Sequence, residues 1–426
     1  MMALVLFFSF IILIFVGVPV AFSLGLSSVL YLIMMDIPLS IAAQKMYAGI
    51  DSFVLICIPG FILAGNLMNT GGITKRIIEF SNAVLGFIRG GLGLANVAAS
   101  MLFAGISGTA LADTASIGGI LIPAMVEEGY EPDFSSAVTA SSSTVGPIIP
   151  PSLPMIIAGT LTGISVGKLF LAGAIPGLLL GLSLMGVSYF ISVKRNHPKG
   201  ERKPFSFIVK SFYGAFWAIF MTILILYGIL GGVFTPTEAS IIAVVYAVIV
   251  GKFIYKELKF RDIPRVIIES MRMTASIMIL VGFANVFAWI MASEQIPQLI
   301  ARTILSISTN KIIVILMINI LLLFVGTFME TIAALVILFP VLLPVAISVG
   351  MDPIQFGVMS VLNLVIGLTT PPVGVCLFVA ASIGKISLAQ ATKAILPFLL
   401  VSLIILALVS YVPAISLFLP SLMAAR

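Results

Sequence analysis

The stretch FAGISGTALADTASIGGILIP, residues 103–123, lies among residues that otherwise predict membrane helix. It nevertheless contains two hydroxyl residues beside glycines, Ser107 and Thr109, and one acidic residue, Asp113. Glycines and hydroxyls spaced this closely indicate a helix break. An ionisable residue inside a membrane is costly and usually serves a function. The stretch therefore predicts a break in a membrane helix that has a chemical use.

Composition places the chain among the integral membrane proteins. Of its 426 residues, 61% are hydrophobic and 9% are charged, whereas a soluble domain carries about 25% charged residues. Uncharged runs long enough for one or two spans of about 20 residues occupy residues 1–35, 53–74, 90–112, 134–167, 169–193, 211–237, 273–293, 353–384 and 394–425. Because lipid offers the backbone no hydrogen-bond partner, we expect these runs to be helices.

The placement of charge predicts the orientation. Twelve of the 22 Lys and Arg residues lie in two loops, residues 194–210 and 252–272. The positive-inside rule predicts that both loops are cytoplasmic. This explanation makes nucleic-acid binding, the other interpretation of a basic cluster, unnecessary. The only histidine, His197, lies in the first loop. A histidine-based metal site or catalytic site therefore has almost no residues to draw on.

Glycine and proline landmarks recur in the same order in the two halves. The pair Gly108-Thr109 recurs 218 residues later, and Pro150-Pro151 recurs 221 residues later. Two single prolines recur in the same way, Pro19 as Pro236 and Pro132 as Pro353. Chance matching is the alternative, but the shared order favours two repeats, residues 1–205 and 206–426. With both basic loops on one side and an odd number of spans in each repeat, the repeats must be inverted.

Each repeat is expected to contain one helical hairpin and one broken helix. Hairpins are predicted at residues 91–127 and 311–350. Their arms are too short for two full membrane spans, so we expect both hairpins to be re-entrant. Broken helices are predicted at 134–162 and 354–384, because a proline pair removes successive backbone donors. The other expected elements are scaffold helices within 1–70 and 211–293, interfacial amphipathic helices at 74–90 and 294–310, and single helices at 165–193 and 393–420. The fold class is an all-α polytopic membrane protein.

Breaks of this kind are suited to binding. Helix ends and unwound turns leave N–H and C=O groups that can hold an anion or a cation near the bilayer midplane. Hydroxyl oxygens at the breaks are hard ligands suited to sodium, and they belong to Ser107, Thr109, Ser143, Thr144, Ser152, Thr327, Thr369 and Thr370. The structural alternative is that each hydroxyl only bonds a carbonyl of its own turn.

The acidic residues of the chain have competing interpretations. Asp113 either binds a ligand or caps the second arm of its hairpin. Glu330 ends the pattern Thr327-x-x-Glu330, which spells a capping box without any role in transport. The patterns at Thr235-Pro236 with Glu238, and at Asp352-Pro353, predict helix caps only.

Four motifs carry a family resemblance: FAGISGTALADTASIGGILIPAM, SSTVGPIIPPS, VGTFMETIAALVILFPVLLPV and GLTTPPVG. With them the whole chain resembles the large membrane subunit of tripartite ATP-independent periplasmic (TRAP) transporters, the DctM family. The resemblance implies an inverted-repeat, elevator-type ion transporter fold and sodium-driven import of a carboxylate solute across the bacterial inner membrane. The solute class is sialic acid or C4-dicarboxylate, and overall similarity favours the sialic acid (SiaM-like) branch. It also implies two partners, a small four-helix DctQ-like membrane subunit and a periplasmic DctP-like solute-binding protein.

The breaks and the resemblance together assign site residues. One sodium ion is expected at Ser107, Gly108, Ser143, Thr144 and Gly146, and another at Gly326, Thr327, Gly367 and Thr370. The solute is expected near Ser107 and Ser152, with Asp113 and Glu330 as further candidates. No organic cofactor is expected.

Two other classes of function remain possible from the sequence. Asp113 and Glu330 could form the carboxylate pair of an intramembrane enzyme, although neither an HExxH motif nor a Ser/His arrangement accompanies them. A channel with a fixed site is the other alternative. The absence of a Walker A loop favours a secondary transporter over an ATP-driven one.

Overall fold

The computed structural model describes residues 2–424. This part of the chain is 79% helical and contains no strands. Within it, 7 helices are long and apolar enough to cross a membrane, and shorter apolar helices accompany them. Large apolar side chains such as Phe8, Phe190 and Phe324 are exposed on the outside, as a surface in contact with lipid requires. The expected class, an all-α polytopic membrane protein, is confirmed.

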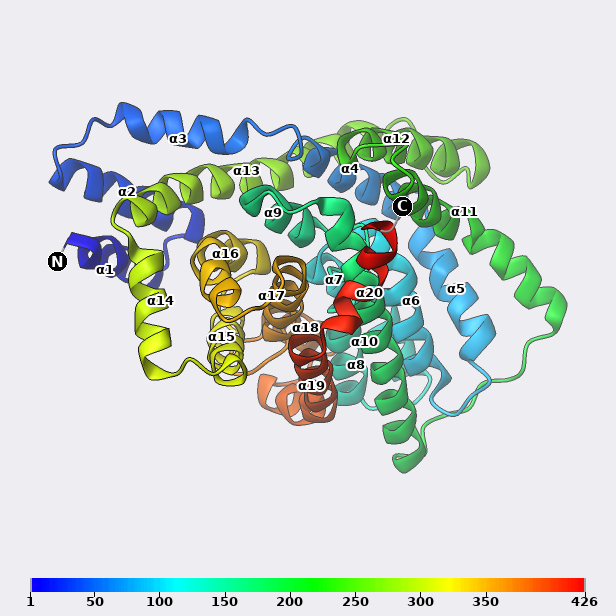
Figure 1. Ribbon diagram of the computed structural model, residues 1–426. Coiled ribbons are helices and arrows are strands. Elements are labelled where there is room, and N and C mark those ends of the chain that lie inside the picture. The colour runs from blue at the N-terminus through cyan, green and yellow to red at the C-terminus, as the bar shows by residue number, and fades with distance from the viewer. Residues whose placement is uncertain (1, 425–426) are drawn as a thin grey trace.

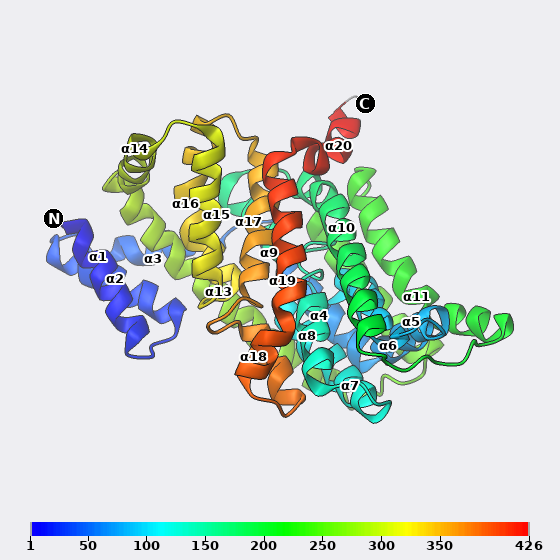
Figure 2. The same cartoon turned by 90° about the horizontal axis from the view of Figure 1, so that it is seen from below.

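The predicted scaffold segments form two sets of helices that pack together. The first set is α1 (Met2–Phe15), α2 (Val20–Met34), α3 (Ser40–Ile50) and α4 (Cys57–Thr70). The second set is α11 (Phe205–Leu230), α12 (Pro236–Ile249) with the π-helical turn η1 (Val250–Ile254), and α13 (Ile263–Ser293). Helix α4 packs against α12 and α13, and α13 also packs against α2 and α3. Both views place α1 and α2 at one end of the molecule and α11 at the other (Figures 1 and 2).

Two amphipathic helices lead from these elements into the core. They are α5 (Ile73–Leu85) and α14 (Ile296–Ile307), in the segments where interfacial helices are expected. Helix α5 packs against α6 and α11, and α14 packs against α13 and α16. Each therefore touches both a scaffold element and the first or second arm of a hairpin segment.

The core consists of two sequences of helices that interlock. The first is α6 (Gly91–Ser107), α7 (Ala110–Glu127), α8 (Pro132–Ser143), α9 (Leu153–Thr162) and α10 (Val166–Lys194). The second is α15 (Lys311–Gly326), α16 (Thr331–Ser348), α17 (Pro353–Gly367), α18 (Val375–Ile383), α19 (Leu388–Tyr411) and α20 (Pro413–Ala424). Helix α18 packs against α7 and α8, whereas α9 packs against α16 and α17. The second half of each broken segment thus lies against helices from the other half of the chain.

The C-terminal region departs from expectation. The single helix predicted at 393–420 is wrong, because α19 ends at Tyr411 and α20 begins at Pro413. Val412 between them has φ −113° and ψ 91°. A residue before proline is pushed out of the helical region by the proline ring, so the chain turns here, and α20 packs back against α10.

Two predicted helix caps are confirmed. Thr235 accepts a hydrogen bond from the Glu238 N–H at 3.2 Å, and the Glu238 carboxylate accepts one from the Thr235 N–H at 2.8 Å. Asp352 accepts from the N–H groups of Ile354 and Gln355 at 2.7 and 3.3 Å. The Thr235 hydroxyl and the Asp352 carboxylate satisfy free N–H groups in the first turns of α12 and α17, and the Glu238 carboxylate satisfies the N–H of the N-cap residue.

The linker between α10 and α11 is fastened to the linker between α5 and α6. Gly90 N–H donates to the Pro198 carbonyl at 3.0 Å, and Gly200 N–H donates to the Gly86 carbonyl at 3.1 Å. Gly90 has φ +73°, and a Cβ there would lie 2.1 Å from Ser192 Oγ. Only glycine fits both the left-handed backbone and this close approach.

His197 anchors the same linker to the start of α8. Its ring lies between Tyr130 and Phe134, with centroid distances of 4.8 and 4.4 Å. Its Nε2 is 2.5 Å from Glu131 Oε2, and its Nδ1 is 3.0 Å from Ser192 Oγ. Burial raises the pKa of Tyr130 to about 12, so this phenol stays neutral. The basic loop is therefore docked through a buried histidine.

The Gly90 contact leads to a stability prediction. Replacing Gly90 with alanine should lower the free energy of unfolding by about 1–3 kcal/mol beyond the cost of the left-handed backbone, because the new methyl group overpacks against Ser192. Gly163→Ala is the matched control, since Gly163 also has φ +73° but a Cβ there would meet nothing within 4 Å. Thermal unfolding of the two purified variants in detergent measures the difference, and equal melting temperatures would contradict the contact.

Candidate functional site

The first break separates α6 from α7. Helix α6 ends at Ser107, and Gly108 follows with φ +64°. Thr109 caps α7, with its hydroxyl accepting a hydrogen bond from the Ala112 N–H at 3.4 Å. The Ser107 side chain, to which the sequence assigns both ion and solute contacts, lies outside the described residues. The break falls at the Gly-Thr pair that the sequence singled out.

Asp113 lies in the first turn of α7 and is fully buried, with 0% exposure. A Cβ placed on Gly146 would lie 2.2 Å from Asp113 Oδ2, so the carboxylate lies directly against the unwound turn after α8. This position brings Asp113 together with one of the residues assigned to the first sodium ion. A negative charge here also interacts favourably with the N-terminal end of the α7 dipole.

The first broken helix stops at Ser143 and resumes at Leu153. Ser143 and Thr144 donate to the carbonyls of Thr139 and Ser141 at 2.7 and 2.6 Å. Ser152 donates to the Pro147 carbonyl and caps α9 by accepting from the Met155 N–H at 3.3 Å. These hydroxyls therefore make the local bonds that the structural alternative expects. A hydroxyl that donates in this way still has acceptor lone pairs for a cation.

The second break separates α15 from α16. The Glu330 carboxylate caps α16 by accepting from the N–H groups of Ile332 and Ala333 at 2.9 and 3.3 Å. The predicted capping box is wrong in its geometry, because Glu330 is itself the N-cap and Thr327 ends the preceding helix. The Thr327 hydroxyl donates to the Phe324 carbonyl at 2.7 Å. The capping role of Glu330 is nevertheless real.

The second broken helix stops at Gly367 and resumes at Val375. A Cβ on Gly367 would lie 2.6 Å from Gly326 Cα, so the end of α15 and the end of α17 meet backbone to backbone. Gly374 N–H donates to the Thr327 carbonyl at 3.2 Å. Thr370 donates to the Ile366 carbonyl at 2.9 Å. The residues assigned to the second sodium ion thus lie at a single junction between hairpin tip and broken helix.

The four breaks share one cavity of about 80 Å³. It is lined from both hairpin segments and both broken segments by Thr109, Ala110, Leu111, Pro147, Pro154, Glu330, Thr331, Leu368, Val375 and Cys376. Helices α7, α9, α16 and α18 begin at Ala110, Leu153, Thr331 and Val375, so four helix N-termini converge on this space. Helix N-termini carry partial positive charge and bind anions.

Some polar residues that join the hairpin segments to the broken segments were missed by sequence reasoning. Asn96 on α6 donates to Thr139 at 2.7 Å and accepts from Ser142 at 3.0 Å. In the second half, Asn363 donates to the Asn319 side chain at 2.7 Å. Carboxamides inside apolar runs often join membrane helices, and this signal could have identified them. They hold the first arm of each hairpin segment to the first half of each broken segment.

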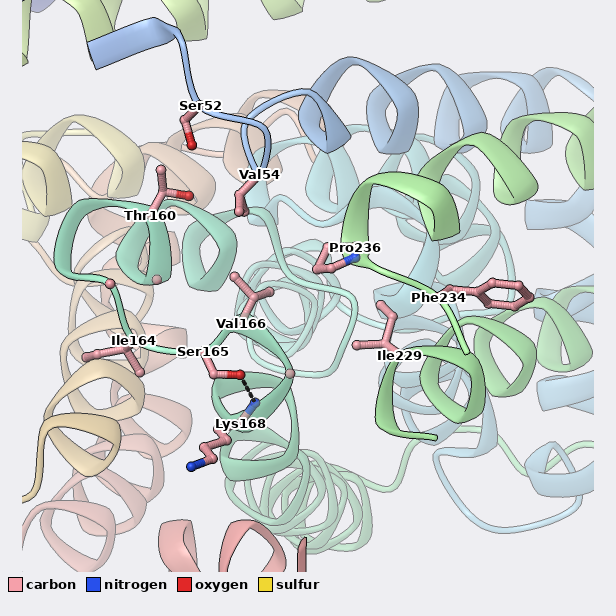
Figure 3. Close-up of a pocket in the computed structure, with 13 residues that line it drawn as sticks. Ser52, Val54, Thr160, Ile164, Ser165, Val166, Lys168, Ile229, Phe234 and Pro236 are labelled. Atoms are coloured by element: carbon pink, nitrogen blue, oxygen red, sulfur yellow. Dashed lines mark hydrogen bonds between the residues drawn. The ribbon is translucent and has the colours of Figure 1, made fainter. Parts of the chain in front are cut away.

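A larger cavity of about 470 Å³ lies away from the breaks (Figure 3). It separates the turn between α9 and α10 from the scaffold near Val54, Ile229 and Pro236. On the core side a Cβ added to Gly167 of α10 would lie 3.5 Å from Ile229 Cγ2 of α11. The scaffold and the core are thus in limited contact along this boundary.

Comparison with known proteins agrees with this arrangement. A family model described as the tripartite ATP-independent periplasmic transporter, DctM component, matches residues 7–415. The chain is 44% identical over 414 residues to the sialic acid TRAP transporter large permease protein SiaM of Vibrio cholerae, covering 96% of each chain. It is 39% identical over 438 residues to the C4-dicarboxylate TRAP transporter large permease protein DctM of Rhodobacter capsulatus, covering 99% of this chain and 100% of the relative.

A solved structure shares the fold. The YdaH transporter of Alcanivorax borkumensis superposes with a TM-score of 0.62 at 14% identity, covering 87% of this chain and 86% of that chain. The sequence relatives are transporter permeases, which removes the interpretation of Asp113 and Glu330 as the catalytic pair of an enzyme. The family match spans both repeats and all four breaks. This chain therefore belongs to the DctM family, the large membrane permeases of TRAP transporters.

Proposed function

We propose that this permease imports a carboxylate solute across the bacterial inner membrane together with sodium ions. The observation that carries the proposal is the convergence of four helix N-termini on one cavity lined by both hairpin segments and both broken segments. Partial positive charge at these termini suits a carboxylate, and the open turns beside them offer oxygen ligands for sodium.

Two sodium ions would bind on either side of this cavity. The first would use oxygens at Gly108, Ser143, Thr144 and Gly146, and the buried Asp113 beside Gly146 would compensate its charge. The second would lie where Gly326 meets Gly367, with Thr327 and Thr370 close by. Backbone carbonyls would supply much of each shell. Bound sodium would in turn stabilise the solute carboxylate, and this couples sodium binding to solute binding.

The solute class we propose is sialic acid, with C4-dicarboxylate as the alternative. The relative named for sialic acid is 44% identical to this chain and the C4-dicarboxylate relative is 39% identical. The cavity of about 80 Å³ holds only two or three water molecules at about 30 Å³ each. A sugar acid therefore requires the site to open, and we propose that it opens as the core moves against the scaffold.

The movement would be that of an elevator. The second hairpin tip is joined to its broken helix by direct backbone contact at Gly326 and Gly367, and Asp113 of the first hairpin segment lies against Gly146, which favours motion of these elements as a rigid unit. The scaffold helices α4, α12 and α13 would stay fixed, with α5 and α14 as the connections.

The solute would be delivered by a periplasmic binding protein, and a small four-helix membrane subunit would complete the permease. The loops 194–210 and 252–272 would lie in the cytoplasm.

The charge of Asp113 provides a test of sodium coupling. Asp113→Asn keeps the side-chain volume but removes the charge beside Gly146, so the sodium concentration for half-maximal uptake should rise about tenfold. Uptake into proteoliposomes containing both partner proteins measures it. Asp133→Asn is the matched control, because Asp133 pairs with Arg195 at 2.9 Å outside the breaks. An unchanged sodium dependence in Asp113→Asn would exclude Asp113 from the ion site.

A crosslink between core and scaffold provides a test of the moving unit. A Cβ on Gly167 of α10 would lie 3.5 Å from Ile229 Cγ2 on α11, so cysteines at these two positions would face each other, and their oxidation to a disulfide should abolish uptake while solute binding remains. Cysteines at Gly71 and Gly251, which meet within the scaffold, should crosslink without loss of uptake. Full transport after complete oxidation of the first pair would favour a fixed-site channel over an elevator.

A further inference from the structure

A second small cavity lies between the proposed solute site and the scaffold. Its volume is about 40 Å³, and it lies between α4 and α13 on one side and α6, α7 and α9 on the other. Thr109, the cap of α7, lines both this cavity and the cavity shared by the four breaks. The two spaces therefore lie on either side of one residue at the first hairpin tip.

The scaffold wall of this second cavity carries two carboxamides among apolar residues. Asn66 and Asn69 line it from α4, and Ser116 lines it from α7. The two asparagines are three residues apart, so they lie on the same face of α4. Asn69 Nδ2 donates across the boundary to Ser116 Oγ at 3.4 Å, and Asn69 Oδ1 accepts from Thr74 at 2.7 Å.

The Asn66 side chain donates to two residues of α13, Ser270 and, at 3.9 Å, Met273 Sδ. Its Nδ2 donates to Ser270 Oγ on α13 at 2.9 Å, which is a common way to join two membrane helices. Its Oδ1 accepts no hydrogen bond from the residues that the structure describes. Asn66 therefore presents an acceptor at the cavity that the packing of α4 on α13 does not use.

We propose that Asn66 and Asn69 form the scaffold wall of the solute site and bind hydroxyl or amide groups that the solute carries away from its carboxylate. A carboxamide both donates and accepts hydrogen bonds and has no charge. It therefore distinguishes polyhydroxylated or amide-bearing acids from dicarboxylates that lack such groups. The inference rests on the proposed transport function and assigns these two residues to solute selection.

The geometry divides recognition between the two units. The core, with its four helix N-termini, would hold the carboxylate and the sodium ions. The scaffold amides would contact the rest of the solute only where α7 lies against α4. Loss of these amides should then weaken solute binding and leave sodium binding intact, because no sodium ligand assigned above lies on α4.

The test uses the purified complex of this chain with its small membrane subunit. Titration with sialic acid in saturating sodium should show a threefold to tenfold weaker dissociation constant for Asn66→Ala and for Asn69→Ala. The thermal stabilisation that sodium alone produces should match that of the unmodified complex. Ser270→Ala is the matched control, since it removes the α13 partner of Asn66 and leaves the amide in place, and it should bind sialic acid normally.

The possible outcomes separate the inference from the function on which it rests. Unchanged affinity in both asparagine variants, or equal weakening in Ser270→Ala, overturns the role of the amides while transport stands. Sodium-dependent binding of succinate without binding of sialic acid also overturns it, because succinate carries no hydroxyl or amide group. If the unmodified complex shows no sodium-dependent binding or uptake of either solute, the proposed function itself is wrong.

Discussion

One constraint governs the core: a backbone N–H or C=O group released by a helix break inside a membrane must find its partner within the protein. The helix that leads into each break is accordingly enclosed. Every residue of α8 from Phe134 to Ser143 and every residue of α17 from Gln355 to Gly367 is buried. The first unwound turn, residues 144–152, is also buried apart from half-buried Ile149, whereas Pro372 and Val373 in the second unwound turn are exposed.

Glycine makes the enclosure tight enough to be useful. Gly146 leaves room for the Asp113 carboxylate, and Gly326 and Gly367 allow two helix ends to meet along their backbones. A side chain at any of these positions would separate a hairpin tip from its broken helix. The same contacts hold each hairpin tip against its broken helix. The boundary between the core and the scaffold differs from these glycine contacts, because it includes cavities and few polar contacts.

Hydroxyl groups at the breaks make local hydrogen bonds and keep acceptor lone pairs. Ser143, Thr144, Thr327 and Thr370 each donate to a carbonyl of their own turn. That bond orients the oxygen and leaves its lone pairs directed elsewhere. The two interpretations weighed from the sequence are therefore compatible at these positions. The Glu330 carboxylate caps α16 by accepting from the N–H groups of Ile332 and Ala333. It also lines the shared cavity, so an experiment can test whether it contacts the solute as well.

The sequence alone determined the membrane class, the family and the positions of the breaks, because apolar run length, glycine and proline act through local backbone chemistry that needs no tertiary contact. It also determined the caps at Thr235 and Asp352 for the same reason. Only the tertiary structure decided that Asp113 lies against Gly146, that Glu330 caps α16 without help from Thr327, and that Asn66 and Asn69 face the first hairpin tip. These facts depend on which helices pack together, and packing between residues far apart in the chain leaves no periodic trace in a single sequence.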